Sequence, residues 1–139
     1  MLNFTIMALY AKLTIEGRQY NVMECEYEFT QAVDITGRPS DRPRGGMLHV
    51  TIQSPDDKDL MLHEWMRDKD TTRDGTLVMY VNRDSVNAPK TIKFQDAYCV
   101  RLYEYFNDNN NLPMYTKLGI MAGTLTFGGD DECEFKMID

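Results

Sequence analysis

Cysteine is scarce in this 139-residue sequence, and its spacing excludes two common classes of small protein. The three cysteines are Cys25, Cys99 and Cys133, and no two of them have CxxC spacing. An odd number of cysteines in separate strand-like segments speaks against a disulfide framework and against a zinc site. We therefore expect three buried, reduced thiols and no metal.

Basic residues are outnumbered, and long apolar runs are missing. Fifteen basic residues face twenty-two acidic ones, which gives a net charge of −7. This balance argues against nucleic acid and against an anionic membrane surface as partners. No apolar run approaches the roughly 20 residues of a membrane span, so we expect no membrane insertion. The opening MLNFTIM lacks the basic region of a secretory signal; we expect residues 1–7 to be an extension and residues 8–139 a single domain.

Recognisable catalytic motifs are also missing. The two histidines, His49 and His63, accompany no nucleophile elbow, no HExxH spacing and no phosphate-binding glycine loop. Glu24, Glu26 and Glu28 alternate along a strand-like segment, a pattern typical of a solvated sheet face. The acidic stretch GGDDECE lacks the spacing of a calcium-binding EF-hand. The sequence thus predicts neither an enzyme nor a cofactor.

The main pattern in the sequence is the alternation of apolar and polar residues, and apolar residues make up 42% of the chain. A period of two predicts half-buried strands, here over residues 9–15, 19–33, 47–52, 76–81, 90–106, 114–127 and 132–137. The 114–127 segment is expected to bend at Gly119 or Gly123. In residues 19–33 one face should carry Met23, Cys25, Tyr27 and Phe29. In residues 90–106 one face should carry Ile92, Phe94, Tyr98, Val100, Leu102 and Phe106, which leaves Lys93, Arg101 and Tyr105 facing away from the Phe94 side.

One helix is expected after the third of these strands. Ser54 has the character of a cap, Pro55 suits the first helical position, and Asp57 completes an S-x-x-D box. The helix should extend to about residue 68, with Leu62, Trp65 and Met66 packing in the core through their i, i+3 and i+4 spacing. Seven strands and one helix predict a mainly β fold, a compact antiparallel barrel of two packed sheets with one flanking α-helix.

The loop DITGRPSDRPRGG, residues 34–46, is the feature that this fold leaves unexplained. Its thirteen residues exceed the about 4–6 that usually connect elements in compact domains. Pro39 and Pro43 stiffen the backbone, and arginine suits planar pairing with carboxylates. Gly45 and Gly46 allow a sharp return into the next strand. A stiff basic arm on an acidic body is able to reach a second copy of that body, which indicates self-assembly.

Three stretches of the chain resemble a known family. They are FTQAVDITGRPSDRPRGGMLHVTIQS from Phe29, HEWM at 63–66 and IKFQDAYCVRLYEYF at 92–106. Together they resemble the Bacteroidetes branch of Hcp, the TssD tube protein of the type VI secretion system. The most specific parts are D-x-x-GRP-S with the following R-GG, and F-x-DAYCV. The resemblance covers roughly residues 8–139.

The resemblance implies a structural role. In this family a β-barrel with one flanking helix forms rings of six copies, and the rings stack into a tube inside a contractile sheath. A spike protein sits at the tube tip, and effector proteins travel in the lumen. Such a subunit is cytoplasmic during assembly and then leaves through its own apparatus without a signal peptide.

The family also gives the unexplained loop a role, because its counterpart helps to join one ring to the next. The expected ring-stacking residues are Asp34, Gly37, Arg38, Pro39, Ser40, Arg42, Pro43, Arg44, Gly45 and Gly46. Acidic residues on the adjacent ring are the expected acceptors, either Glu24, Glu26 and Glu28 or Asp130, Asp131 and Glu132.

Two other functions remain compatible with the residues alone. A monomeric β-barrel ligand-binding module would use the barrel interior as its pocket. An effector enzyme fused to, or imitating, a tube subunit would need a catalytic domain, for which the chain is too short.

Overall fold

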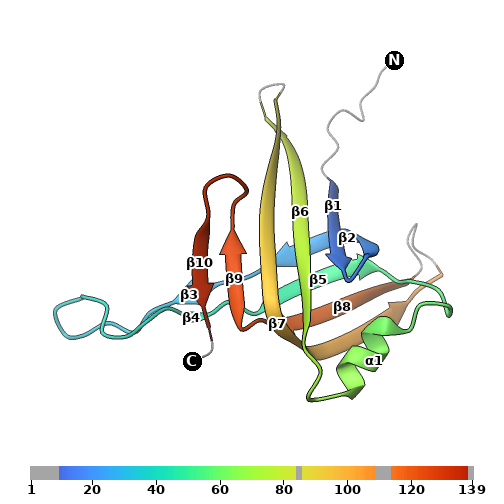
Figure 1. The fold of residues 1–139 in the computed structure, drawn as a ribbon, viewed down its shortest axis with the longest axis horizontal. Helices are drawn as coiled ribbons and strands as arrows, with labels where there is room; N and C mark the ends of the chain where they lie inside the picture. Colours follow the sequence, from blue (N-terminus) through green and yellow to red (C-terminus); the bar gives the residue numbers. More distant parts are fainter. Residues whose placement is uncertain (1–9, 84–85, 109–113, 138–139) are drawn as a thin grey trace.

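The computed structural model describes residues 10–83, 86–108 and 114–137 (Figure 1). The expected extension at residues 1–7 lies outside these ranges. Strand is the dominant element, and one short helix accompanies it, as predicted. In chain order the elements are β1 (Tyr10–Ile15), β2 (Arg18–Glu26), β3 (Phe29–Thr30), β4 (Arg44–Gly45), β5 (Leu48–Gln53), α1 (Met61–Arg67), β6 (Arg73–Arg83), β7 (Val86–Phe106), β8 (Met114–Met121), β9 (Thr124–Phe127) and β10 (Cys133–Lys136).

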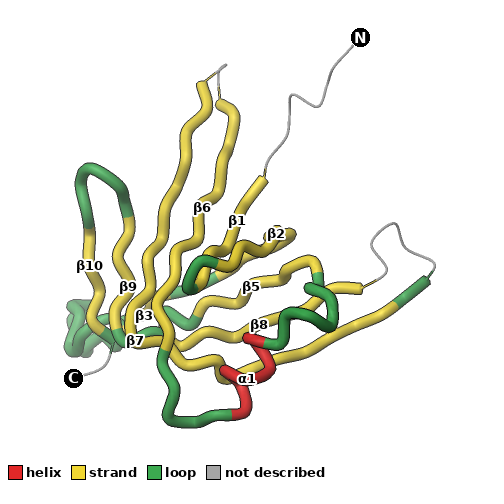
Figure 2. The backbone as a smooth tube through the Cα atoms, turned by 45° about the vertical axis from the view of Figure 1, so that its right-hand side comes forward, coloured by secondary structure: helices red, strands yellow, loops and turns green. Residues whose placement is uncertain are grey.

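Six strands close into an antiparallel barrel. The order around it is β7-β6-β1-β2-β5-β8, and β8 pairs back onto β7. The strand β7 closes the barrel because its first part pairs with β6 and its last part, from Tyr98 on, pairs with β8. The β9–β10 hairpin extends the sheet from the first part of β7 (Figure 2). The strands β3 and β4 form a separate small sheet.

A bend near Asp96 divides β7 into these two parts. Asp96 has a positive φ of 53°, and its N–H donates to the Asp74 carboxylate over 2.9 Å. The Gly123 N–H donates to the carbonyl oxygens of Gln95 and Asp96, at 3.0 and 3.1 Å. Gly123 also separates β8 from β9, so of the two predicted bend positions it is the correct one. Gly119 lies inside β8.

The prediction of a single apolar face along β7 is wrong, because the bend and a register shift change which side faces the core. Ile92 and Phe94 are buried before the bend, whereas Ala97 and Cys99 are buried after it. A second shift lies between Cys99 and Arg101. As a result, Val100 is 45% exposed, although it was expected on the core face. Leu102 packs against the core again after the second shift, whereas Phe106, at the end of β7, is 65% exposed.

A bulge causes the same error in β2. The register shifts between Val22 and Glu24, so Met23 is the extra residue and is half exposed. Bulges of this kind bend a strand and reverse its inward and outward sides. Cys25 remains packed against the core, but Met23 does not share its face as predicted.

The helix is shorter than the sequence predicts. It begins at Met61, and residues 54–60 form turns and irregular structure. Ser54 does not cap it, because its hydroxyl hydrogen-bonds the Thr116 hydroxyl over 2.7 Å. The Met61 N–H instead donates to the carboxylate of Asp59 over 3.2 Å. The Tyr20 hydroxyl donates to the same carboxylate, which attaches the helix entrance to β2.

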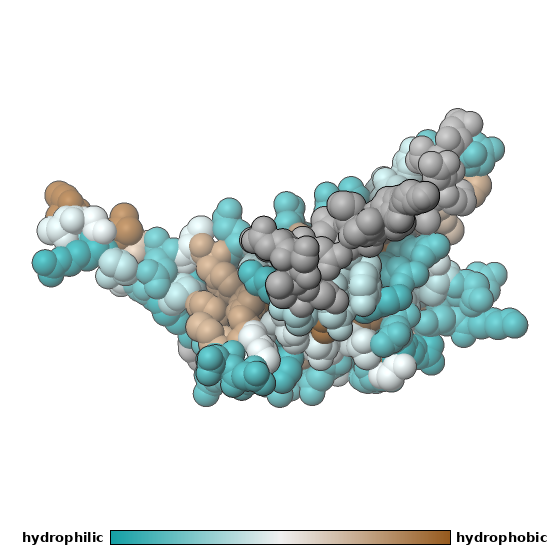
Figure 3. Space-filling view, turned by 90° about the horizontal axis from the view of Figure 1, so that it is seen from above, coloured by the Kyte–Doolittle hydropathy of each residue, from teal (hydrophilic) through white to brown (hydrophobic). Residues whose placement is uncertain are grey.

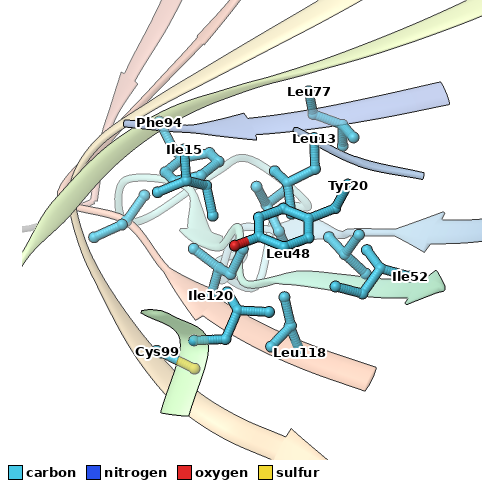
Figure 4. Packing of buried hydrophobic residues seen from close by; sticks show 14 of the residues in the cluster. Leu13, Ile15, Tyr20, Leu48, Ile52, Leu77, Phe94, Cys99, Leu118 and Ile120 are labelled. Carbon is cyan, nitrogen blue, oxygen red and sulfur yellow. The ribbon is translucent and has the colours of Figure 1, made fainter. Parts of the chain in front are cut away.

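One hydrophobic cluster fills the barrel. Figure 4 shows Leu13, Phe94 and Ile120, from three different strands, pointing into a common interior. The helix adds Leu62 and Trp65, both essentially buried, and the indole N–H of Trp65 donates to the Ala97 carbonyl oxygen over 3.1 Å. Met66 is 40% exposed, so the expectation that it packs in the core is wrong. The helix ends after Arg67, and its buried side is formed by Met61, Leu62 and Trp65.

Replacement of Trp65 by alanine should destabilise the fold severely. Trp65→Ala removes a fully buried ring and leaves the Ala97 carbonyl without its indole donor. The free energy of unfolding in urea should fall by about 3–5 kcal/mol. Met66→Ala on the same helix is the matched control and should cost less than about 1 kcal/mol. Equal losses in the two variants would contradict this description of the core.

Candidate functional site

The expected long loop is an ordered hairpin that projects from the barrel, and we call residues 29–45 the arm. In Figure 1 it extends to the left of the molecule. At its base Phe29 pairs with Gly45 and Thr30 pairs with Arg44. Farther out, the Ser40 N–H donates to the Ala32 carbonyl oxygen over 2.8 Å, and Val33 forms a bridge with Pro39. The arm thus holds its own shape through backbone hydrogen bonds.

Asp34 organises the tip of the arm. Its carboxylate oxygen accepts hydrogen bonds from the Thr36 hydroxyl at 2.6 Å, the Thr36 N–H at 2.8 Å and the Arg38 N–H at 3.1 Å. These donors, with the Thr36 hydroxyl contributing most, hold the pKa of Asp34 below its usual value. Gly37 completes the turn with a φ of +86°, a conformation that favours glycine. The tip is therefore ordered although it is exposed.

Part of the positive charge of the arm is balanced inside the arm. Arg44 donates to the Asp41 carboxylate over 2.9 Å, and the Arg42 N–H donates to its other oxygen over 2.8 Å. Both bonds, that from Arg44 first, lower the pKa of Asp41. Three arginines against two aspartates leave the arm with a net charge of +1. The arm is consequently less basic than its arginines alone suggest.

The arm tip also carries apolar side chains that the sequence analysis did not single out. Ile35 is 102% exposed and Val33 is mostly exposed. Figure 3 shows hydrophobic colouring at the far end of the arm, well separated from the body. The signal in the sequence is the pair of aliphatic residues on either side of Asp34, inside a segment otherwise rich in turn formers.

Aromatic rings fix the base of the arm. The ring of Phe29 stacks on Phe135 of β10 with centroids 4.3 Å apart, and it meets Phe127 of β9 edge-on at 5.9 Å. A Cβ on Gly46, which has a φ of +77°, would lie 2.9 Å from the Phe29 ring. A Cβ on Gly45 would lie 2.4 Å from the Glu28 carbonyl oxygen. The two glycines are thus required where the arm returns to the barrel.

The two groups of expected acidic acceptors lie in different places. Glu24 and Glu26 are exposed on β2, and Glu28 lies at the arm base, where its carbonyl oxygen accepts the Gly46 N–H over 2.8 Å. Asp130 and Asp131 lie in the β9–β10 turn beside a hollow of about 660 Å³. Glu132, in the same turn, accepts a hydrogen bond from Lys93 over 3.4 Å.

The remaining reactive side chains have structural surroundings. His63 contacts the Glu104 carboxylate at 3.0 Å, and His49 is exposed on β5. Burial raises the pKa of both the Cys25 and the Cys99 thiols to about 11, with Glu26 adding to the effect at Cys25. Cys133 is exposed, which corrects the expectation that all three thiols are buried. It lies where the short edge strand β10 begins.

Two further observations concern the described residues only. Within residues 10–83, 86–108 and 114–137, no three His, Cys, Asp or Glu side chains are grouped so that they could hold a metal ion. The single helix in these ranges is too short to cross a membrane.

Comparison with solved structures finds several similar proteins. Hcp1 from Flavobacterium johnsoniae is 31% identical, with a TM-score of 0.75, over 91% of this chain and 98% of that one. The Hcp1 protein from the E. coli EAEC 042 pathovar is 13% identical, with a TM-score of 0.70, over 92% of this chain and 97% of that one. The secreted protein Hcp3 from Pseudomonas aeruginosa is 12% identical, with a TM-score of 0.65, over 95% of this chain and all of that one. The last two likenesses concern the fold alone.

Comparison with protein families agrees. A search of curated proteins finds no match. The family model for hemolysin coregulated protein Hcp (TssD), however, matches residues 7–134, which is most of the chain. The chain belongs to the Hcp (TssD) family, the structural tube proteins of the type VI secretion system, which are not enzymes.

Proposed function

We propose that six copies of this chain form a closed, head-to-tail ring and that the rings stack into the inner tube of a type VI apparatus. The chain acts as one domain from residue 8 on. The tube grows in the cytoplasm inside a contractile sheath, carries a spike protein at its tip and holds effector proteins in its lumen. The subunit leaves with the tube and needs no signal peptide. The observation that carries this proposal is the ordered, projecting arm.

The arm has the properties of a connector between rings. Its backbone bridge and the hydrogen bonds to Asp34 fix its shape before contact, which reduces the entropy lost on docking. Its tip offers exposed aliphatic surface from Ile35 together with the cation of Arg38. Exposed apolar surface on a projecting element indicates a contact with another protein.

The net charge of the rings favours such a connector. Six chains of −7 each carry −42 per ring, so bare rings repel one another at short range. A local contact of opposite charge offsets this repulsion where the rings meet. An exposed ion pair contributes only about 0–1 kcal/mol, but each ring-to-ring contact would repeat it six times.

We favour the β9–β10 turn as the acceptor of the arm. Asp130 and Asp131 are exposed there and border a hollow of about 660 Å³. Neither makes an ion pair within the described part of the chain. In Figure 1 the turn lies at the upper end of the β9–β10 hairpin and the arm leaves near its lower end. Opposite ends suit a contact that repeats from ring to ring.

The ligand-binding alternative has less support. Such a module would need an open barrel interior, whereas this one holds a cluster of buried apolar side chains that includes Leu13, Ile92 and Leu118. The hollow at the β9–β10 turn lies outside the barrel and opens to the solvent.

Reversing two arm charges should block stacking and leave single rings intact. In Arg42→Glu with Arg44→Glu, the arm would repel the acidic turn of the next ring and would lose its Asp41 contact. Electron microscopy should show rings but no tubes, and secretion should stop. The control is Arg67→Glu with Lys69→Glu, the same charge change at exposed positions at and after the end of α1. Tubes of ordinary length in the arm variant would show that the arm charges do not join the rings.

Loss of the Asp34 carboxylate should loosen the arm tip. In Asp34→Ala the amides of Thr36 and Arg38 lose their acceptor, so their hydrogen exchange should become faster. Since folding lowers the pKa of Asp34, the ordering is complete above the ordinary value of about 3.9 and is lost as the pH falls through the lower folded value.

The exposed carboxylate of Asp57 offers the matched control. Asp57→Ala removes the same charge from the surface before α1 and should leave the exchange of the arm amides unchanged. Equal exchange at Thr36 in the wild type and in Asp34→Ala would show that the tip does not depend on this carboxylate.

A further inference from the structure

Four strands form a continuous sheet with opposite charges at its two ends. The strands are β2, β5, β8 and the second part of β7. Residues on the face turned away from the core fall into two rows across the sheet. The first row is Glu24, Thr51, Lys117 and Tyr103; the second is Glu26, His49, Gly119 and Arg101. Both rows thus have a carboxylate on β2, the acidic end, and an aromatic or cationic side chain on β7, the basic end.

Aromatic rings hold the cations of the basic end in place. The Arg101 guanidinium lies 5.5 Å from the centroid of the Tyr103 ring, and the Lys117 ammonium lies 5.8 Å from the same centroid. Lys117 also lies 5.9 Å from the Tyr115 ring centroid. Cation–π contacts of this kind order the side chains without neutralising their charge.

The charges at both ends have no ionic partner among the described residues. Within the described ranges, Glu24, Glu26, Arg101 and Lys117 form no ion pair, although all four line one hollow of about 100 Å³. Their hydrogen-bonding and ionic capacity is therefore available to another molecule.

The β7 end of the sheet has no second strand partner within the described residues, and α1 packs beside it. From Tyr98 to Phe106, β7 pairs with β8 and with no other described strand. At the other end, Glu24 and Glu26 pair with β5, and the described pairing of β2 with β1 covers Arg18 to Val22. Unpaired strand edges are the usual sites at which a second chain adds to a sheet.

Exposed apolar side chains gather at the same two edges. Val100, Tyr103, Phe106 and Met114 lie at the β7–β8 edge, and Tyr10 and Met23 lie at the β1–β2 edge. The second group borders a mostly apolar hollow of about 210 Å³ between β1, β2 and β6. Each edge thus offers apolar surface beside its charges, as protein interfaces do.

We infer that the basic β7 edge of one copy docks against the acidic β2 edge of the next copy, so that charge fixes the direction of assembly. This inference rests on the proposed ring and names its contact. Joining two acidic edges or two basic edges brings like charges together, which disfavours both of these pairings. A contact between two different edges is heterologous and closes into a ring when repeated by rotation.

Two charge-reversal variants test the inference. Variant A carries Glu24→Lys with Glu26→Lys, and variant B carries Arg101→Glu with Lys117→Glu. In A alone, lysines would meet Arg101 and Lys117; in B alone, glutamates would meet Glu24 and Glu26. We expect each variant by itself to stay monomeric in sedimentation at concentrations where the wild type forms rings.

Mixing A with B should restore assembly. The lysines of A then face the glutamates introduced in B, and the native acidic edge of B faces the native basic edge of A. Rings would contain A and B in strict alternation, which a ring of six permits. Native mass spectrometry of the mixture, with one variant isotopically labelled, should show three copies of each.

The outcomes separate this inference from the proposed function. Wild-type protein that forms no ring overturns both. A ring-forming wild type, with A and B each forming rings alone or with a mixture that stays monomeric, overturns only the edge pairing. Circular dichroism checks that A and B are folded. Should either be unfolded, Glu24→Gln with Glu26→Gln replaces it and should raise the concentration needed for rings by about tenfold or more; an unchanged concentration contradicts the inference.

Discussion

The bend of β7 at Gln95–Ala97 is the constraint on which the rest of this structure depends. A straight strand of 21 residues could pair with β6 or with β8 but could not close a barrel between them. Three elements hold the bend: the Asp74 carboxylate binds the Asp96 N–H, the Gly123 N–H binds two carbonyl oxygens, and the Trp65 indole binds the Ala97 carbonyl. Because each bond satisfies a backbone group that the bend removes from the ladder, the bend is stable inside an antiparallel sheet.

The bend also separates the two surfaces to which we assign assembly. The part of β7 before it carries β9 and β10, whose Phe127 and Phe135 hold Phe29 at the base of the arm. The part after it runs out along β8 and ends in an edge that holds Arg101 and Tyr103. One long strand therefore sets the direction of the arm and the direction of the basic edge relative to each other. Stacking and ring closure would then be geometrically coupled through a rigid barrel, without any moving part.

Sequence periodicity predicts most strands here because half-buried strands must alternate, and it fails where the backbone leaves the regular ladder. A single extra residue at Met23 reverses the inward side of β2, and no residue type near it marks the bulge. Asp96 adopts a positive φ, which aspartate tolerates, but its residue type alone does not predict this conformation. Ser54 and Pro55 are typical of a helix start. The Ser54 hydroxyl, however, hydrogen-bonds Thr116, and Asp59 accepts the Met61 N–H at the actual start of the helix. The arm could be located from its arginines, prolines and glycines. The pairing of Asp41 with Arg44 depends on the fold of the arm, and the charge rows across the sheet depend on the strand register, so neither could be predicted from the sequence.

A ring of six is the central claim, and the mass of the assembled wild-type protein tests it most directly. Six chains of 16.1 kDa give a particle of about 97 kDa. Native mass spectrometry at micromolar concentration and moderate salt should show this mass as the main species, together with integer multiples of it where rings stack. A single species of 16.1 kDa under the same conditions, or a dimer of twice that mass, would contradict the account.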